Sequence, residues 1–127
     1  MQSTINKINN KDSFELLKLC NLNLSNNQLK YDKTCNFFAA CPNLEILDVS
    51  FNIVGEQFFS ITKETFKKLK TLKLHGNNIQ CWKDFVFYEN LEVLRIDYNL
   101  FKDLKSYQKF FEKCKNVNYS VSLIFCF

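Results

Sequence analysis

Glycine and proline are scarce in this 127-residue sequence, which contains two Gly and one Pro. So few turn-forming residues argue against a hairpin-rich β-sandwich and against a glycine-rich phosphate-binding loop. No apolar run reaches the roughly 18 residues that a membrane-spanning helix needs. The first 12 residues are polar and lack the apolar stretch of a signal peptide. We therefore expect an intracellular protein, cytoplasmic or nuclear, that makes no contact with membranes.

Clusters of metal ligands and of catalytic side chains are also lacking. His75 is the only histidine, and six cysteines are scattered without a CxxC pair: Cys20, Cys35, Cys41, Cys81, Cys114 and Cys126. A zinc site needs clustered ligands, and no motif places a thiol beside His75 for nucleophilic catalysis. We expect buried free thiols, no metal, no cofactor, no small-molecule substrate and no enzymatic activity.

The positive charge is mild and is carried almost entirely by lysine. Seventeen basic residues against 13 acidic ones give a formal charge of +4, and Arg95 is the only arginine. Because bidentate reading of bases and phosphates favours arginine, this balance disfavours a sequence-specific nucleic-acid reader. Hydrophobic residues make up 46% of the chain and aromatic residues 16%, which indicates one globular domain with a substantial core.

One pattern of leucines and asparagines occurs four times, with starts 25, 25 and 22 residues apart. Each copy follows the order Leu-x-x-Leu-x-Leu-x-x-Asn-x-Leu, with Val, Ile or Phe in place of some leucines. The copies begin at Leu19, Leu44, Leu69 and Leu91. Because every specified position is filled acceptably, chance coincidence is negligible, and the repeat decides the expected fold.

The central Leu-x-Leu of each copy predicts a short parallel strand whose leucines point inward with period two. The asparagine that follows predicts a sharp turn, because its amide can satisfy backbone groups that the bend leaves unpaired. Apolar spacings of three and four predict helices in the return segments 31–41, 58–69, 82–88 and 104–114. We expect an α/β repeat solenoid with a parallel sheet on its concave face, helices on its convex face, and a structural ladder of Asn27, Asn52, Asn77 and Asn99.

The repeats divide the chain into one domain, 1–127, with a cap at each end, because a solenoid otherwise exposes its core. Residues 12–15 read Asp-Ser-Phe-Glu, which is typical of a capping box at the start of a short helix. Apolar residues alternate from Val117 to Phe125, which predicts a last strand. The expected parts are an N-terminal cap 1–18, repeats 19–43, 44–68, 69–90 and 91–116, and a capping strand 117–127.

The four repeats resemble the leucine-rich repeat superfamily over roughly residues 14–122. Within it, Leu24-Ser25-Asn26-Asn27 and the Cys-Pro-Asn-Leu-Glu-Ile-Leu of residues 41–47 are similar to repeats of the nuclear mRNA-export receptor family. The segment 107–117 resembles a capping helix shared by that family, the spliceosomal A-prime proteins and the dynein leucine-rich repeat light chains. These resemblances imply a protein that acts by binding and not by catalysis.

The strand residues between the inward leucines are expected to face the concave surface. They form four lanes, which are Asn21, Asn23 and Ser25; Ile46, Asp48 and Ser50; Thr71, Lys73 and His75; and Val93, Arg95 and Asp97. A rigid sheet with mixed charge beside aromatic anchors is typical of a protein-binding face. The candidate partner-binding residues are Asp48, Phe51, Lys73, His75, Arg95, Asp97 and Tyr98. The alternative is that the charged residues neutralise one another across strands and that the two aromatics only pack.

Two groups of lysines suggest RNA as an alternative partner. One group lies in a single repeat, and the other lies at helical intervals in the last return segment, with Lys102, Lys105, Lys109 and Lys113 as candidate phosphate contacts. The competing interpretation is a solvated helix face whose lysine stems cover the aromatic core.

The sequence thus predicts a non-catalytic protein-interaction module, a small adaptor, scaffold or structural subunit that docks onto a larger intracellular assembly. The alternative function is a structural, RNA-contacting subunit of a ribonucleoprotein particle such as a ribosome or spliceosome.

Overall fold

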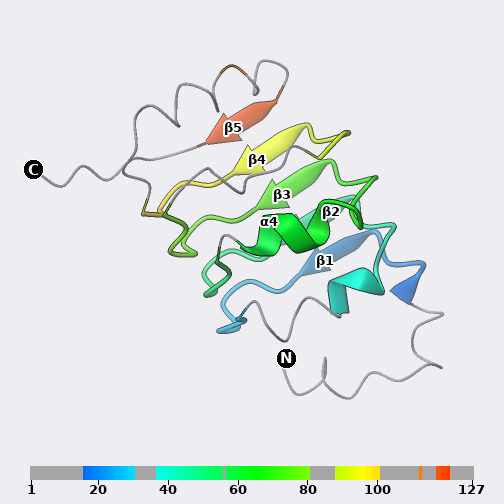
Figure 1. Ribbon diagram of the computed structural model, residues 1–127, viewed down its shortest axis with the longest axis horizontal. Coiled ribbons are helices and arrows are strands. Elements are labelled where there is room, and N and C mark those ends of the chain that lie inside the picture. The colour runs from blue at the N-terminus through cyan, green and yellow to red at the C-terminus, as the bar shows by residue number, and fades with distance from the viewer. Residues whose placement is uncertain are drawn as a thin grey trace, which may run out of the picture.

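Five three-residue strands form one parallel sheet in the computed structural model, which describes residues 16–30, 37–55, 57–80, 88–100, 112 and 117–120. The strands pair in chain order, so each repeat adds one strand beside the previous one. Figure 1 shows them stacked along the molecule. They are β1 (Asn21–Asn23), β2 (Ile46–Asp48), β3 (Thr71–Lys73), β4 (Val93–Arg95) and β5 (Asn118–Ser120).

The register of the sheet aligns the same repeat position in every strand. Leu22 pairs with Leu47, Leu47 with Leu72, and Leu72 with Leu94. Leu47, Leu72 and Leu94 are completely buried, because alternate strand residues point to opposite faces. The predicted parallel-sheet repeat solenoid is confirmed.

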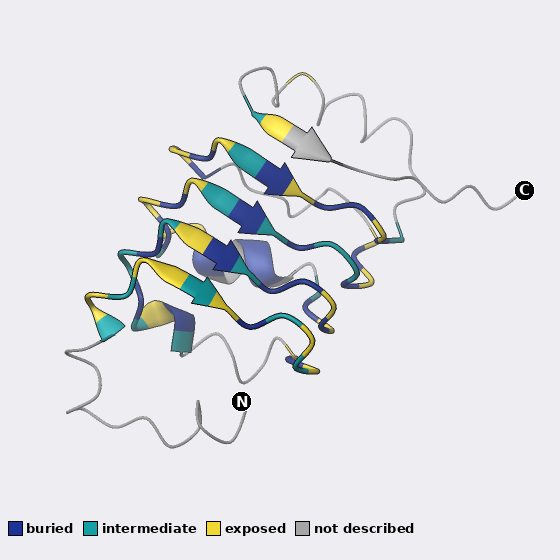
Figure 2. Ribbon diagram, turned by 180° about the vertical axis from the view of Figure 1, so that it is seen from behind, coloured by how far each residue is buried: buried dark blue, intermediate teal, exposed yellow. Residues whose placement is uncertain are grey.

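Helix α4, Gln57–Thr62, lies on one side of the sheet and leaves the other side open. It stands in front of the strands in Figure 1 and behind them in the reversed view of Figure 2. The predicted helical segment 58–69 is only half helical, because the chain passes into turns after Thr62. A shorter helical piece occupies residues 37–39. Of the other two predicted helical segments, only residues 88 and 112 lie among the described residues.

Aromatic rings fill the space between the sheet and α4. Phe38 makes edge-to-face contacts with Phe58 and Phe66, with ring centroids 5.6 and 5.7 Å apart. Phe66 reaches Tyr88 of the following repeat at 6.2 Å. All four side chains are buried, so the high aromatic content of the sequence serves packing between repeats.

A buried hydrogen-bond chain holds the one hydroxyl of this aromatic core. Thr62 donates to the carbonyl of Phe58 at 2.7 Å and lies 2.5 Å from the Tyr88 hydroxyl. Because the Thr62 proton is used within α4, Tyr88 is the donor in the second bond. Burial raises the pKa of Tyr88, so this phenol stays protonated and keeps donating.

The asparagine ladder joins each turn to its neighbour. The Asn52 carbonyl oxygen accepts from the backbone N–H groups of Asn27 and Leu29, both at 2.9 Å. Its amide nitrogen donates to backbone carbonyls of its own repeat and to Leu24 of the repeat before. Asn77 and Asn99 make the same type of bridge, and Asn27 donates to the carbonyls of Leu24 and Ser25.

Several predicted features lie outside the described residues. These are the capping box at 12–15, the end of the last strand beyond residue 120, Cys35, Cys81, Cys114 and Cys126. Of the two described cysteines, Cys41 is buried and Cys20 is exposed. The expectation of a buried thiol is therefore wrong for Cys20, because this residue directly precedes β1, the strand at the end of the sheet order. Burial raises the pKa of Cys41 to about 11, which keeps this thiol protonated and unreactive.

We expect Asn77→Leu to destabilise the protein. The Asn77 amide donates to the carbonyls of Val49, Leu74 and His75, and its oxygen accepts from Val54 N–H. Leucine leaves these groups without partners, which costs about 1–3 kcal/mol of unfolding free energy. Urea unfolding measures the change. The matched control is Asn21→Leu on the exposed strand face, where we expect little effect. Equal stability of Asn77→Leu and wild type would contradict the bridging role.

Candidate functional site

The face of the sheet away from α4, which is turned toward the viewer in Figure 2, is called the open face. Three rows of residues lie on it. Strand pairing aligns the first row, Asn21, Ile46, Thr71, Val93 and Asn118, and the second row, Asn23, Asp48, Lys73 and Arg95. The third row follows the strands and contains Ser25, Ser50, His75 and Asp97. Neighbouring strands lie about 4.8 Å apart, so side chains of one row are near neighbours.

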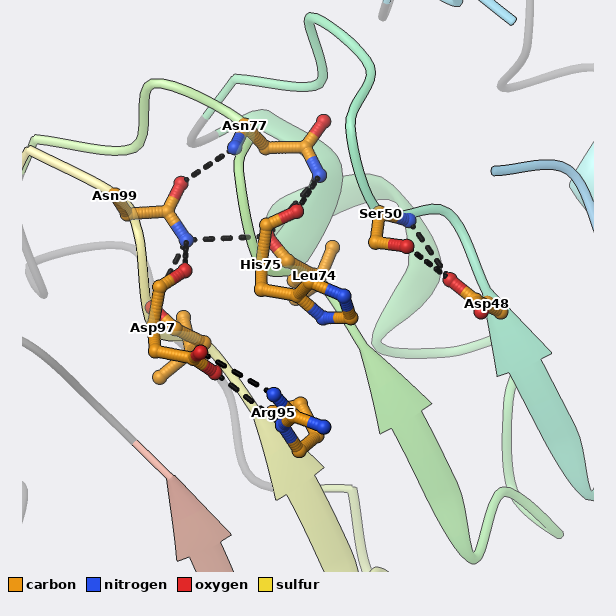
Figure 3. A network of polar contacts seen from close by, with 9 residues as sticks. Asp48, Ser50, Leu74, His75, Asn77, Arg95, Asp97 and Asn99 are labelled. Atoms are coloured by element: carbon orange, nitrogen blue, oxygen red, sulfur yellow. Dashed lines mark hydrogen bonds and ion pairs between the residues drawn. The ribbon is translucent and has the colours of Figure 1, made fainter. Parts of the chain in front are cut away.

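In the first two repeats, the second and third rows are joined by short hydrogen bonds. The Ser50 backbone N–H and hydroxyl donate to one Asp48 carboxylate oxygen at 3.0 and 2.6 Å. Ser25 donates in the same way to the Asn23 side-chain oxygen. These side chains are held in place before any partner arrives, as Figure 3 shows for Asp48 and Ser50.

In the fourth repeat an ion pair replaces this arrangement. The Arg95 Nε and Nη2 atoms donate to the two carboxylate oxygens of Asp97, both at 3.3 Å (Figure 3). This hydrogen bond and the charge of Asp97 raise the pKa of Arg95. The pair lies within one repeat, at the end of β4, whereas the alternative interpretation predicted that charges neutralise one another across strands. Among the described residues, no ion pair joins Asp48 to Lys73 in the second row.

His75 occupies the middle of the open face and differs from its neighbours in the third row. Its Nδ1 atom is buried and has no hydrogen-bond partner among the described residues. The ring meets the Phe51 ring edge to face, with centroids 5.1 Å apart. Burial lowers the pKa of His75, and the Arg95 charge lowers it further against the opposing effect of Asp97. His75 is therefore neutral at physiological pH.

The corner between each strand and its ladder asparagine has a left-handed backbone. The residues there are Asn26, Phe51, Gly76 and Tyr98, with φ of 59°, 53°, 70° and 54°. Asparagine and glycine suit this conformation, whereas for most other side chains it costs roughly 1–2 kcal/mol. Phe51 and Tyr98 are nevertheless 50% and 71% exposed. Burial of their rings therefore offsets little of this conformational free energy.

Glycine at position 76 makes room for the Phe51 ring. A Cβ atom on Gly76 would lie 2.6 Å from Cδ1 of Phe51, which is closer than carbon atoms approach. The absence of a side chain at Gly76 therefore lets Phe51 lean across the corner toward His75.

All seven candidate partner-binding residues lie on the open face or at its corner. Asp48, Lys73 and Arg95 are in the second row, His75 and Asp97 are in the third, and Phe51 and Tyr98 are at the corner. The four ladder asparagines lie behind that corner, with Asn52, Asn77 and Asn99 buried. The candidate RNA contacts Lys102, Lys105, Lys109 and Lys113 are outside the described residues.

Two residues that the sequence did not single out also shape this region. Gly76 leaves room for the Phe51 ring. The sequence feature that could have identified Gly76 is its position directly before a ladder asparagine. Ile53 is 45% exposed and lies two residues after Phe51. The repeat pattern leaves Ile53 unspecified between Asn52 and Val54, which are both buried, and this position is the signal that could have identified it.

Part of the other lysine group, which lies within residues 63–73, is already paired. Lys67 lies 3.2 Å from Glu64, and Lys70 lies 3.5 Å from Glu45, all with exposed side chains. Such surface pairs contribute little to stability, but they reduce the positive charge available to a polyanion. Within the described ranges, no group of three His, Cys, Asp or Glu side chains could hold a metal ion.

Comparison with known proteins finds relatives built from the same kind of repeat. The chain is 36% identical to lumican from Oryctolagus cuniculus over 106 residues, which cover 81% of this chain and 53% of lumican. It is 37% identical to Toll-like receptor 2 from Boselaphus tragocamelus over 82 residues, 63% of this chain and 10% of the receptor. The chain thus spans about half of one relative and a tenth of the other. No protein-family model matches the sequence.

Among solved structures, internalin C2 from Listeria monocytogenes str. 4b F2365 has a similar fold. The superposition has a TM-score of 0.58 and covers 98% of this chain and 61% of internalin C2, with 17% sequence identity. This likeness supports the solenoid fold alone. The finer resemblance to the mRNA-export, spliceosomal and dynein families stays a prediction.

The expectation of an intracellular protein is wrong. Lumican is an extracellular-matrix protein and Toll-like receptor 2 is a membrane receptor. The sequence relatives are therefore not intracellular proteins, which overturns that expectation. The repeat pattern could not report this, because it records core packing, which is the same in every compartment. Among the described residues, no helix is long and apolar enough to cross a membrane.

We expect Gly76→Ala to displace the Phe51 ring and to cost about 1–3 kcal/mol of unfolding free energy. The new methyl group meets Cδ1 and Cε1 of Phe51 at a φ of +70°. In a Phe51→Ala background the same substitution should cost only the backbone part, about 1 kcal/mol. A double-mutant cycle by urea unfolding separates the two contributions. Equal costs in both backgrounds would show that Phe51 does not occupy this space.

Protein stability should fall as His75 becomes protonated. The folded-state pKa lies below the unfolded value of 6.5, so the unfolded chain takes up the proton first. The stabilisation is complete above the unfolded pKa and is lost as the pH falls through the folded pKa. Between about pH 7.5 and about pH 5, wild type should therefore lose more unfolding free energy than His75→Gln. NMR titration of this single histidine gives the folded-state pKa directly. A value of 6.5 or higher would contradict the burial of Nδ1.

Proposed function

Because the chain belongs to the leucine-rich repeat superfamily, we propose that it is a non-catalytic module that holds a protein partner on its open face. Its leucine-rich repeat relatives are non-enzymatic, and protein binding is the role that they support for this chain. Since the chain spans only part of each relative, the partner and the wider assembly belong to the proposal.

The observation that carries this proposal is the pair of exposed aromatics at strained corners. Phe51 and Tyr98 adopt left-handed backbone conformations that suit Asn or Gly, and both present their rings to solvent. Strained residues persist where the surrounding structure enforces them, and they cluster at ligand-binding sites. Tyrosine and arginine are enriched among the residues that dominate binding energy, and Arg95 lies three residues before Tyr98.

The rest of the open face also suits a protein partner. Its strands are held by backbone pairing, and both of its carboxylates, Asp48 and Asp97, are already hydrogen-bonded within their own repeats. A partner therefore binds without the entropic cost of ordering this surface. In this proposal the chain is an adaptor or structural part of a larger extracellular or membrane-associated assembly.

The RNA-contacting alternative has no specific observation in its favour. Its four candidate lysines lie outside the described residues. In the other lysine group, Lys67 and Lys70 are paired with glutamates.

The double variant Arg95→Gln/Tyr98→Asn tests the open face. Asparagine suits the left-handed corner, and glutamine can still donate to Asp97, so we expect the melting temperature to be kept. Partner affinity should fall by about 2–4 kcal/mol, as with other central arginine and tyrosine residues. Binding is measured by calorimetry with a partner purified from cell-surface or matrix extracts.

The control is Lys105→Glu/Lys109→Glu, which should leave partner affinity unchanged and keep its salt dependence small. If the lysine reversals abolish binding and the Arg95/Tyr98 variant does not, the open face is not the binding surface.

A further inference from the structure

Two cationic side chains with unused hydrogen-bond donors lie next to each other on the open face. Lys73 and Arg95 are direct register partners on β3 and β4. Arg95 uses Nε and Nη2 for Asp97, which leaves the other N–H groups of its guanidinium unused within the described part of the chain. Within that part, no carboxylate pairs with Lys73. The two heads therefore offer several donors to one anionic group.

Apolar surface flanks these cations at both ends of the strands. In the first row, Ile46 is 39% exposed and Val93 lies on the same strand as Arg95. At the corner, Phe51 and Tyr98 are exposed. In an extended segment, alternate side chains on one face are about 6.6 Å apart, which is also the spacing between the first and second rows.

We propose that the partner segment bound on the open face is acidic, with one carboxylate between Lys73 and Arg95 and apolar side chains two residues away on either side. One apolar side chain lies on Ile46 and Val93, and the other lies toward the aromatic corner. This inference rests on the proposed function and adds the chemical class of the partner.

A protein carboxylate fits this surface better than a sulfated polysaccharide does. In the described part of the open face the cations are only two. Asp48 lies beside Lys73 in the second row, and Asp97 follows Arg95 in the third row. A densely charged chain would bring its neighbouring anions against these carboxylates, which is unfavourable. Apolar and aromatic flanks match the side chains of a peptide.

His75 provides a built-in reporter for an anion at this position. Lys73, Arg95, Asp97 and Asp48 all act on its pKa, so its ring senses charge in the second row. It is also the only histidine in the sequence, which makes its NMR signals unambiguous. A bound carboxylate favours the imidazolium form and should raise the pKa of His75.

The probe is an acetylated and amidated peptide, Gly-Leu-Ser-Glu-Ser-Leu-Gly, titrated into the full chain to millimolar concentration. Two matched peptides carry Gln or Lys in place of Glu. We expect the Glu peptide to shift the His75 ring signals saturably, to raise the pKa of His75 and to bind about tenfold more tightly than the Gln peptide. The Lys peptide should not bind. Equal effects of the Glu and Gln peptides would overturn the proposal.

Protein variants assign the response to the two cations. Lys73→Gln should weaken Glu-peptide binding about tenfold, whereas Lys68→Gln, an exposed lysine after α4, is the matched control and should have no effect. Undiminished binding by Lys73→Gln would contradict the site. A heparin tetrasaccharide serves as the rival anion. If the His75 signals respond to heparin but not to the Glu peptide, the ligand of this site is a polysaccharide and the acidic-peptide proposal is wrong.

The test also separates this inference from the proposed function. If the purified partner loses affinity for Arg95→Gln/Tyr98→Asn but binds Lys73→Glu as tightly as wild type, the open face binds the partner and the acidic contact is wrong. If neither variant weakens the partner, the proposed function itself fails.

Discussion

The amide groups of the ladder asparagines are the interaction on which the rest of the structure depends. Each strand is followed by a sharp corner. The corner N–H of Phe51 still donates to the His75 carbonyl of the next repeat, whereas the N–H groups of Asn27 and Leu29 are bound by the Asn52 side chain. Asn52, Asn77 and Asn99 accept from backbone N–H groups and donate to carbonyls of two successive repeats. Because these groups are buried, losing an amide leaves them unsatisfied. The ladder therefore sets both the turn and the alignment of neighbouring strands.

The same corner determines what the open face presents. The backbone turns left-handed at the residue before each ladder asparagine, which directs Phe51 and Tyr98 toward solvent. Gly76 between them leaves space that the Phe51 ring uses. A structural requirement of the turn thus produces an exposed aromatic corner beside the charged rows. The left-handed backbone favours Asn or Gly at these positions, so the two aromatics are the feature on which the proposed function depends.

In the described part of the chain, the carboxylates of the open face are bound within their own repeats and not by cations of neighbouring strands. Asp48 is held by Ser50, and Asp97 is held by Arg95, so both carboxylates are occupied within their own repeats. Lys73 lies between them in the sheet order, and none of the described carboxylates pairs with it. His75 stays neutral because its Nδ1 atom is buried without an acceptor. The surface is consequently preorganised and locally cationic, although its formal charges balance.

The sequence by itself determined the solenoid, because inward leucines at period two and an asparagine at a constant offset admit one backbone path. It also determined which residues share the open face, since strand alternation assigns Lys73 and Arg95 to one row. Only the tertiary structure decided that Arg95 pairs with Asp97 of its own repeat, that Phe51 rests over Gly76 and that Cys20 is exposed. Those outcomes depend on side-chain reach and on the left-handed corner, which no periodicity encodes. The compartment was not readable from the repeats, because the core packs in the same way wherever the protein resides.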